Sequence, residues 1–470
     1  MRDCDECNTC DTRNDSTRVV KEGVGGTFWF DVTRTCNFNC AYCFQGEHAW
    51  TWQREKGLKK FISSEIISKS IPLIQKWQRE TGCTICWYGG EPLLRFDLIK
   101  QWTPKLLEEI PKCRVSITSN GSLLNEEVQA FMDEYNVGLL LSLDGPEWVH
   151  NKTRVLAGGK PSWKMIDPLQ KLKWRPDLEL AWQLTPESVP EPKDLDWMVD
   201  NGFARINFNV NWLSEWDEVA QGKLRDFMFH ALSLTIQYRL GMSTREFNTN
   251  WYQRMEKYIR GAGKREIKPC GTGMGMISVT PEGDIYPSQE MGFMVHEPGK
   301  APGTAEFYKM GNVLSDPIWA PDEKLQRIFA LKNDDMVPPA GRDCLTCPVR
   351  SVCFGGCHCR YVGQDGIDPS YRYDVMPGWC QSQIAAVSGA LMAFARYGKL
   401  KLFDDVQKSS AKDRTSANGP VVKHQLSIVD LDRKLDKVLE YLSISQGETQ
   451  LLQGGYNKLW ASVNKEKENK

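Results

Sequence analysis

Several features are scarce in this 470-residue sequence, and each scarcity excludes a class of protein. No apolar run approaches the ~20 residues that a membrane-spanning helix needs, and residues 1–21 contain no apolar core of a secretory signal. Neither charge sign dominates, because 59 Lys and Arg stand against 60 Asp and Glu. That balance gives no electrostatic reason to expect nucleic acid or an anionic membrane as a partner. We therefore expect a cytoplasmic protein with neither partner.

Histidine is scarce as well, with 6 residues against 16 cysteines. In a reducing compartment, so many cysteines at short spacings indicate metal ligands rather than disulfides. The shortage of histidine favours all-thiolate sites, which suit iron–sulfur clusters or zinc. The rest of the composition, 41% hydrophobic and 25% charged, matches an ordinary globular enzyme and excludes a mainly disordered or collagen-like chain.

Short β-branched or aromatic runs alternate with amphipathic stretches through the first half of the chain. The predicted strands are residues 27–33, 83–88, 114–118, 137–143, 178–184 and 204–210. Six strand–helix units in succession imply an α/β fold with a parallel sheet and right-handed crossovers, either open or curled into a partial barrel. In such sheets the chemistry lies at the carboxyl ends of the strands.

The rhythm changes along the chain and predicts seven parts. These are a Cys-containing N-terminal arm (1–26), the barrel (27–235), a helical connector (236–269), a Cys-rich domain (270–385), a closing helix (386–407), a flexible linker (408–424) and a C-terminal helix with a charged tail (425–470). The apolar spacing in the last part suits either a short coiled coil or a helix packed on its own protein.

The first predicted strand leads into a loop that carries Cys36, Cys40 and Cys43. Three thiolates on one loop can hold three irons of a cubane cluster and leave the fourth iron open, as a reactive cluster needs. The alternative is a zinc knuckle that lacks its fourth ligand. Each of the next three strands also ends in a motif: Tyr88-Gly89-Gly90-Glu91-Pro92, Ser119-Asn120-Gly121 and Leu141-Ser142-Leu143-Asp144-Gly145-Pro146.

Over roughly residues 27–235, these motifs resemble those of the radical S-adenosylmethionine (SAM) enzymes. The resemblance implies a partial (β/α)6 TIM barrel in which Cys36, Cys40 and Cys43 hold a [4Fe–4S] cluster that binds SAM. It also implies SAM contacts from Tyr42, Gly89, Gly90, Glu91, Ser142, Arg154 and Ile206, the last of which could equally be core packing. The implied chemistry is one-electron cleavage of SAM to a 5′-deoxyadenosyl radical, with the electron supplied by a donor such as flavodoxin or ferredoxin.

A second set of cysteines resembles the SPASM domain, which carries auxiliary iron–sulfur clusters, and resembles in particular that of the anaerobic sulfatase-maturating enzymes. By this resemblance one [4Fe–4S] cluster is held by Cys344, Cys347, Cys353 and Cys380. By the same resemblance, Cys270 and Cys357 belong to another auxiliary cluster. We therefore expect one or two auxiliary [4Fe–4S] clusters.

The resemblance breaks just after the Gly283 turn. Where the family carries a cysteine, this chain has Ser288, whose hydroxyl is a poor ligand for iron. A further family cysteine is missing near Met276. The auxiliary cluster that includes Cys270 and Cys357 could be completed by Cys359 or by Cys4, Cys7 and Cys10, could keep open irons, or could be absent.

A second break concerns the catalytic base. The sulfatase maturases carry an aspartate where this chain has Gln289, which cannot titrate. Glu290 is adjacent, but its side chain points elsewhere if the segment is extended. We therefore expect a radical SAM/SPASM enzyme that modifies a ribosomally made peptide or a protein, for example by a cross-link, with its catalytic residue unassigned. A sulfatase maturase, a SAM-dependent carbon methylase and a non-catalytic iron–sulfur or zinc protein stay as alternatives. Cys83, Cys86 and Cys113 are predicted to be buried and inert.

Overall fold

The computed structural model of the chain describes residues 26–45, 53–171, 175, 178–211, 214–259, 275–296, 304–315, 336–337, 347, 349, 353, 373–374 and 377–398. The chain divides into two compact units. Unit 1 comprises Met1–Ala181, Lys268–Val337 and Gly356–Asp374, and unit 2 comprises Trp182–Ile267, Pro338–Gly355 and Val375–Lys470. The predicted fold class is confirmed, because the fold is α/β with a mostly parallel sheet of the partial-barrel type.

Unit 1 is built on a sheet in the order β10-β9-β8-β1-β2-β3-β4-β5. Its strands are β1 (Thr27–Thr33), β2 (Cys83–Gly89), β3 (Cys113–Ser119), β4 (Gly138–Ser142), β5 (Glu179–Leu184), β8 (Met276–Val279), β9 (Asp284–Tyr286) and β10 (Gly311–Asn312). Strands β1 to β5 pair in parallel, and β8 pairs in parallel with the other side of β1. The hairpin strands β9 and β10 are antiparallel to their neighbours. Residues 276–312, which we predicted as part of a second domain, thus continue the sheet of the barrel.

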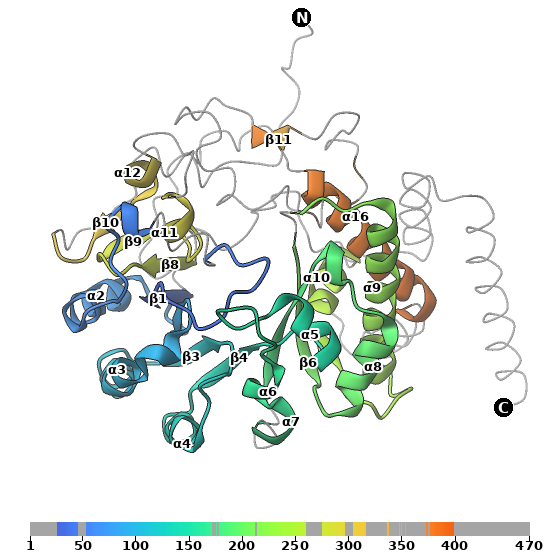
Figure 1. Cartoon of the computed structure of the whole chain (residues 1–470), viewed down its shortest axis with the longest axis horizontal. Coiled ribbons are helices and arrows are strands. Elements are labelled where there is room, and N and C mark those ends of the chain that lie inside the picture. The colour runs from blue at the N-terminus through green and yellow to red at the C-terminus, as the bar shows by residue number, and fades with distance from the viewer. Residues whose placement is uncertain are drawn as a thin grey trace, which may run out of the picture. The chain divides into compact units, whose positions relative to one another are not determined.

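Helical segments connect the strands of unit 1 along the chain. They are α2 (Ser64–Trp77), η1 (Pro92–Arg95), α3 (Phe96–Glu109), α4 (Glu126–Glu134), α5 (Glu147–Thr153), α6 (Trp163–Ile166), α7 (Pro168–Lys171), α11 (Met291–Met294) and α12 (Thr304–Tyr308). Figure 1 shows α2, α3 and α4 one after another outside β1 to β4. In the core, Phe28 of β1 contacts Trp77 of α2 edge to face, and Phe30 of β1 stacks on Trp87 of the neighbouring strand β2. A two-stranded sheet of β11 (Met336–Val337) and β12 (Tyr373–Asp374) completes unit 1.

Unit 2 contains the end of β5, followed by β6 and β7. Its elements are η2 (Pro186–Ser188), α8 (Pro192–Asp200), β6 (Arg205–Val210), α9 (Glu218–Arg239), β7 (Asn248–Thr249), α10 (Asn250–Ile259), α16 (Pro377–Ala393) and η4 (Phe394–Gly398). Helices α9 and α16 pack backbone to backbone, because a Cβ at Gly389 would lie 2.0 Å from the carbonyl oxygen of Arg225. No helix in the described part of the chain is long and apolar enough to cross a membrane.

Three of the predicted parts of the chain fall on residues that the structure does not describe. The N-terminal arm up to residue 25, the linker at 408–424 and the C-terminal helix at 425–470 lie outside the described residues. The domain boundaries proposed from the sequence therefore stay predictions.

Candidate cofactor site

The three-cysteine loop begins two residues after the end of β1 and lies against the Gly89–Pro92 turn. The amide of Gly90 donates to the carbonyl of Thr33 (2.6 Å), and that of Glu91 donates to the carbonyl of Thr35 (2.9 Å). A Cβ at Gly90 would lie 2.1 Å from the Thr35 carbonyl oxygen, so this position accepts only glycine without a backbone shift. The double glycine therefore lets the turn after β2 approach the residue that precedes Cys36.

Cys36, Cys40 and Cys43 are half-buried. The pKa values of Cys36 and Cys40 are raised to about 12, mainly by burial and in smaller part by the neighbouring thiols. Cys36 Sγ accepts hydrogen bonds from the amide of Phe38 (3.4 Å) and from Asn120 Nδ2 (3.7 Å), which favour its thiolate. The thiols thus lie close enough to interact, in surroundings that disfavour three uncompensated charges.

The three thiols of the loop are the donor type that iron–sulfur clusters use. Within the described residues, no three Cys, His, Asp or Glu side chains are grouped so that they could hold a single metal ion. In an iron–sulfur cluster the thiolates bind different irons, so three cysteines on one loop need not converge on one point. The N–H donors directed at Cys36 are also the contacts that tune thiolate ligands of a cluster. The donor set therefore fits a [4Fe–4S] cluster, and the assignment of Cys36, Cys40 and Cys43 as ligands stays a prediction.

Glu91 connects the motifs at the ends of β2 and β3. Its fully buried carboxylate accepts from the amide of Leu93 (3.0 Å), from Ser119 Oγ (2.9 Å) and from the amide of Asn120 (2.8 Å). Burial raises the pKa of Glu91 to about 7, although these three donors work against the shift. Because both carboxylate oxygens are occupied, Glu91 holds the two turns together.

Asp144, which follows β4, organises a second polar group. Its Oδ2 accepts from the hydroxyls of Tyr42 (2.6 Å) and Thr153 (3.0 Å), and Arg154 Nε lies 3.0 Å from the same oxygen. Burial raises the pKa of Tyr42 well above 10, so its hydroxyl stays protonated and donates. The Arg154 guanidinium lies 5.4 Å from the centre of the Tyr42 ring and lowers the pKa of Cys40. Tyr42 and Arg154, two predicted SAM contacts, are therefore brought together at the cysteine loop.

The buried His150 supports this group through the backbone of Asp144. Burial, together with the charge of Arg154, lowers the pKa of His150 well below 6.5, so the ring is neutral. Its Nδ1 accepts from the amide of Asp144 (3.2 Å), and its Nε2 faces Ser162 Oγ at 2.9 Å. Ser142, a further predicted contact, is half-buried at the end of β4.

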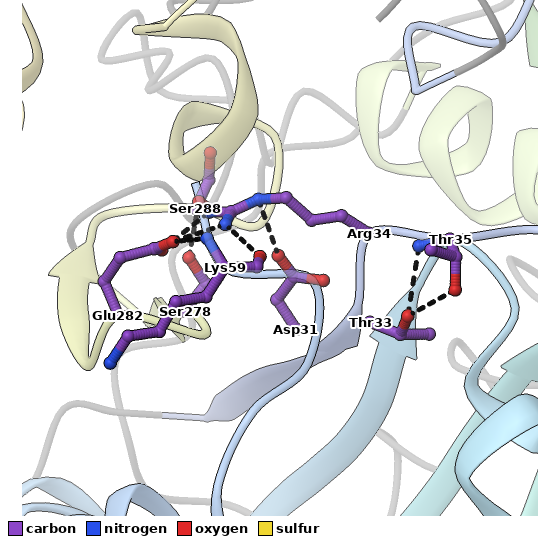
Figure 2. A network of polar contacts seen from close by, with 8 residues as sticks. All are labelled: Asp31, Thr33, Arg34, Thr35, Lys59, Ser278, Glu282 and Ser288. Carbon is purple, nitrogen blue, oxygen red and sulfur yellow. Dashed lines mark hydrogen bonds and ion pairs between the residues drawn. The ribbon is translucent and has the colours of Figure 1, made fainter. Parts of the chain in front are cut away.

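Residue 34, between β1 and the cysteines, forms an ion-pair network that the sequence did not indicate (Figure 2). The Arg34 guanidinium donates two hydrogen bonds to the carboxylate of Glu282, at 2.7 and 2.8 Å, and one to the carbonyl of Lys59 (2.8 Å). Asp31 Oδ2 lies 3.8 Å from Arg34 Nε. The ring of Phe293 lies 5.5 Å from the guanidinium and also contacts Phe44 of the cysteine loop. The hairpin at 276–296 is thus fastened to that loop by charge and by aromatic contact.

Asp31 is the least satisfied member of this network. Its side chain is buried in β1, and neither oxygen has a hydrogen-bond partner within the described residues. Burial raises the pKa of Asp31 to about 7, against the opposing charge of Arg34. A lone acidic residue in the run Thr27-Phe28-Trp29-Phe30-Asp31-Val32-Thr33 was the sequence signal that could have found it.

The segment that departs from the sulfatase-maturase pattern is folded by protein contacts. Ser288 is buried, its carbonyl accepts from Ser278 Oγ (2.8 Å), and its hydroxyl accepts from the amide of Met291 (3.4 Å). Residues 288–290 form a bend and a turn, and Glu290 has helical dihedral angles (φ −75°, ψ −35°). The premise of an extended segment was therefore wrong. The charge of Glu290 raises the pKa of Tyr88 at the end of β2, after burial as the main cause.

The remaining predicted residues lie in unit 2 or outside the described residues. Ile206 is buried in β6, on the strand face it shares with Phe208, which packs on Phe227 of α9. That placement accords with core packing, and a contact with adenine stays a prediction. Cys347, Cys353 and Cys380 are half-buried, and Trp379 Nε1 donates to Cys353 Sγ (3.0 Å).

The other predicted ligands of the auxiliary clusters are not among the residues that the structure describes. The cysteines outside the described residues are Cys4, Cys7, Cys10, Cys270, Cys344, Cys357 and Cys359. Cys83, Cys86 and Cys113 lie in β2 and β3, and the first two are buried.

Comparison with known proteins agrees with this geometry. A family model described as "Radical SAM superfamily" matches residues 30–173. The cysteine-type anaerobic sulfatase-maturating enzyme of Clostridium perfringens (strain 13) is 25% identical over 366 residues, which cover 74% of this chain and 91% of that enzyme. The radical SAM cyclopropyl synthase TigE of Paramaledivibacter caminithermalis is 26% identical over 271 residues, or 54% of this chain and 55% of TigE.

Solved structures share the fold. A histidine-tagged form of anSMEcpe with bound AdoMet has a TM-score of 0.59 at 15% identity, and the match covers 78% of this chain and 96% of the other. "Native anSMEcpe with bound AdoMet and Kp18Cys peptide" has a TM-score of 0.58 at 16% identity, with 77% and 96% covered. At these identities the likeness concerns the fold.

Proposed function

We propose that this chain, which is a radical SAM superfamily enzyme resembling the anaerobic sulfatase-maturating enzymes, abstracts hydrogen from a peptide or protein and thereby modifies it. The observation that carries the proposal is the packing of the Gly89–Pro92 turn against the cysteine loop. The glycines let this turn pack against the backbone that leads into Cys36, which supports a cofactor site formed where the ends of neighbouring parallel strands meet. The peptide class of substrate is supported by relatives whose names place them among protein-modifying enzymes.

In this proposal Cys36, Cys40 and Cys43 hold a [4Fe–4S] cluster. When bound, the cluster supplies the electron that cleaves SAM and so generates the 5′-deoxyadenosyl radical. Around it, Gly89 and Gly90 present their backbone to the methionine end of SAM.

The SAM-binding surface is completed by side chains from three strand ends. Glu91 orients the turn that carries the glycines, because its own oxygens are already bonded. Ser142 and Arg154 face the ribose and carboxylate, and Asp144 fixes the guanidinium in place. Tyr42 covers the adenine, while Ile206 is either a further adenine contact or part of the core.

Auxiliary clusters remain part of the proposal. Cys344, Cys347, Cys353 and Cys380 form one four-thiolate set, and Cys270 with Cys357 belongs to another. Ser288 is an unsuitable ligand in the second set, because a hydroxyl is a poor replacement for a thiolate on iron. Gln289 speaks against sulfatase maturation, which leaves cross-linking or a related modification of a short peptide as the favoured reaction.

The decisive experiment is anaerobic reconstitution with iron and sulfide, followed by iron counting and assay of 5′-deoxyadenosine with dithionite as reductant. We expect the wild-type protein to cleave SAM and Cys40→Ala to lose cleavage while keeping its auxiliary iron. Cys113→Ala is the matched control and should behave like the wild type. Zinc binding without SAM cleavage would contradict the proposal, and S-adenosylhomocysteine among the products would indicate a methylase instead.

A further inference from the structure

One exposed surface beside the cysteine loop is rich in basic residues. Between the buried Gln53 and Ile62, the chain exposes Arg54, Lys56, Lys59 and Lys60, against a single acidic residue, Glu55. The chain as a whole carries a formal net charge of −1, so this positive concentration is local. We name this segment, residues 54–61, the basic surface.

Exposed apolar side chains adjoin the basic surface at its Phe61 end. Phe61 is 43% exposed and Leu94, in η1, is 40% exposed. The guanidinium of Arg95 lies 5.2 Å from the centre of the Phe61 ring, which places Phe61 beside the Gly89–Pro92 turn and its following helix. Exposed aromatic and aliphatic side chains with a charged rim are typical of a protein–protein interface.

The basic surface is connected directly to the strand that leads into the cysteines. Phe61 forms a bridge with Thr33, the last residue of β1, and the amide of Arg34 donates to the carbonyl of Lys60 (2.9 Å). Arg34 also donates from its side chain to the carbonyl of Lys59, as Figure 2 shows. From the Lys60 carbonyl, one hydrogen bond and a short stretch of backbone lead to Cys36. A molecule seated on this surface is therefore within a short through-bond route of the proposed cluster.

We infer that the basic surface docks an acidic one-electron carrier protein, of the flavoprotein or iron–sulfur kind, which reduces the cluster. This inference rests on the proposed function, because it needs a cluster at Cys36, Cys40 and Cys43. In the transfer the carrier loses one electron and the cluster gains it, with no atom exchanged. Opposite charges bring such partners together quickly and orient them, and the attraction weakens as salt screens it.

The test is a charge reversal that avoids the Arg34 contacts. Arg54→Glu/Lys60→Glu changes two exposed side chains, and the control Lys69→Glu/Lys164→Glu reverses the same number of exposed charges on α2 and α6. Binding of oxidised flavodoxin is measured by titration calorimetry with unreconstituted protein. Because steering typically raises association rates ~10-fold or more, we expect Kd to rise about tenfold at low salt in the first variant. The control should leave Kd unchanged, and ~1 M salt should abolish the difference.

A second readout separates docking from chemistry. With reconstituted protein, the first variant should form 5′-deoxyadenosine more slowly from reduced flavodoxin and at the wild-type rate from dithionite. The inference is wrong if the flavodoxin Kd is unchanged, or if both reductants are affected alike. It is also wrong if only the peptide substrate binds less tightly, since the surface would then belong to the substrate. If the wild type binds flavodoxin but does not cleave SAM with dithionite, the proposed function fails rather than the docking surface.

Discussion

Glu282→Gln is the most informative single substitution, because it removes one charge from the Arg34 network and preserves the shape of the side chain. In the native protein the Arg34 side chain is 2% exposed and that of Glu282 is 22% exposed. The glutamine can accept one hydrogen bond, but its NH2 group faces an N–H of Arg34 that needs an acceptor. A buried guanidinium is then left with Asp31, 3.8 Å from its Nε, as its nearest anion.

The size of the effect follows from that burial. Removing one partner of a fully buried ion pair costs about 3–5 kcal/mol. Glu282 is partly exposed and Asp31 remains, so we expect a loss of about 2–3 kcal/mol in the free energy of unfolding. For a unit of this size, ~1 kcal/mol corresponds to roughly 2–4 °C, which gives a fall in Tm of about 5–10 °C.

The assay is thermal and urea unfolding of the purified protein under anaerobic conditions. Burial pushes the pKa of Glu282 up, but the hydrogen bonds and charge of Arg34 outweigh it and hold this pKa below 4.5. The stabilisation from the Arg34–Glu282 ion pair is therefore fully present above about pH 4.5. It disappears as the pH falls through the pKa of Glu282 in the folded protein. Asp97→Asn is the matched control, since Asp97 pairs with Arg95 at the surface, where ~0–1 kcal/mol is usual. Equal effects of the two substitutions at neutral pH would refute the reasoning.

Three further predictions, one of them with a control substitution, test other contacts. The pKa of Asp31 is raised in the folded protein, so the stability that this group contributes falls as pH rises from about 4 to about 7. An asparagine at this position does not titrate, so the stability of Asp31→Asn relative to the wild type should rise through the same pH range. Urea unfolding at several pH values measures this difference. Gly389→Ala would place a Cβ 2.0 Å from a backbone oxygen of α9, so we expect a loss of about 3 kcal/mol or more. Gly222→Ala, where the new Cβ meets nothing within 4 Å, should be neutral or gain ~0.5–1 kcal/mol. Gly90→Ala should lower the iron and SAM bound after reconstitution, and a normal iron content with normal SAM affinity would count against the close approach of that turn.

The parts of the fold that depend on local pattern were predictable from the sequence. The run at 27–33 is β1 with the same bounds, and the amphipathic stretches that follow open with residues of the capping type, Ser63 and Asn125, which accept from the amides of Ile66 and Val128. Strand periodicity and capping depend on neighbours within four residues, so the sequence displays them directly. The motifs at the strand ends follow the same logic, because a parallel sheet brings its carboxyl ends to one edge.

The contacts that link distant segments were not predictable. Arg34 and Glu282 are 248 residues apart, and nothing near either residue distinguishes it from an ordinary surface charge. The Gly-rich hairpin after residue 275 suggested a separate domain, whereas β8 pairs with β1. The expectation of an extended segment around Glu290 was wrong, because Ser288 there accepts from the amide of Met291 within the turn and from the hydroxyl of Ser278 in β8.

The pairing of β8 with β1 has a consequence for any attempt to shorten this protein. A chain cut after residue 260 would retain the six-strand sequence pattern but lose the neighbour that saturates one side of β1. The freed amides and carbonyls of that strand, with Phe28 and Phe30 between them, would offer a template for intermolecular pairing. We expect such a fragment to precipitate, and solubility to return only when the segment through Asn312 is restored.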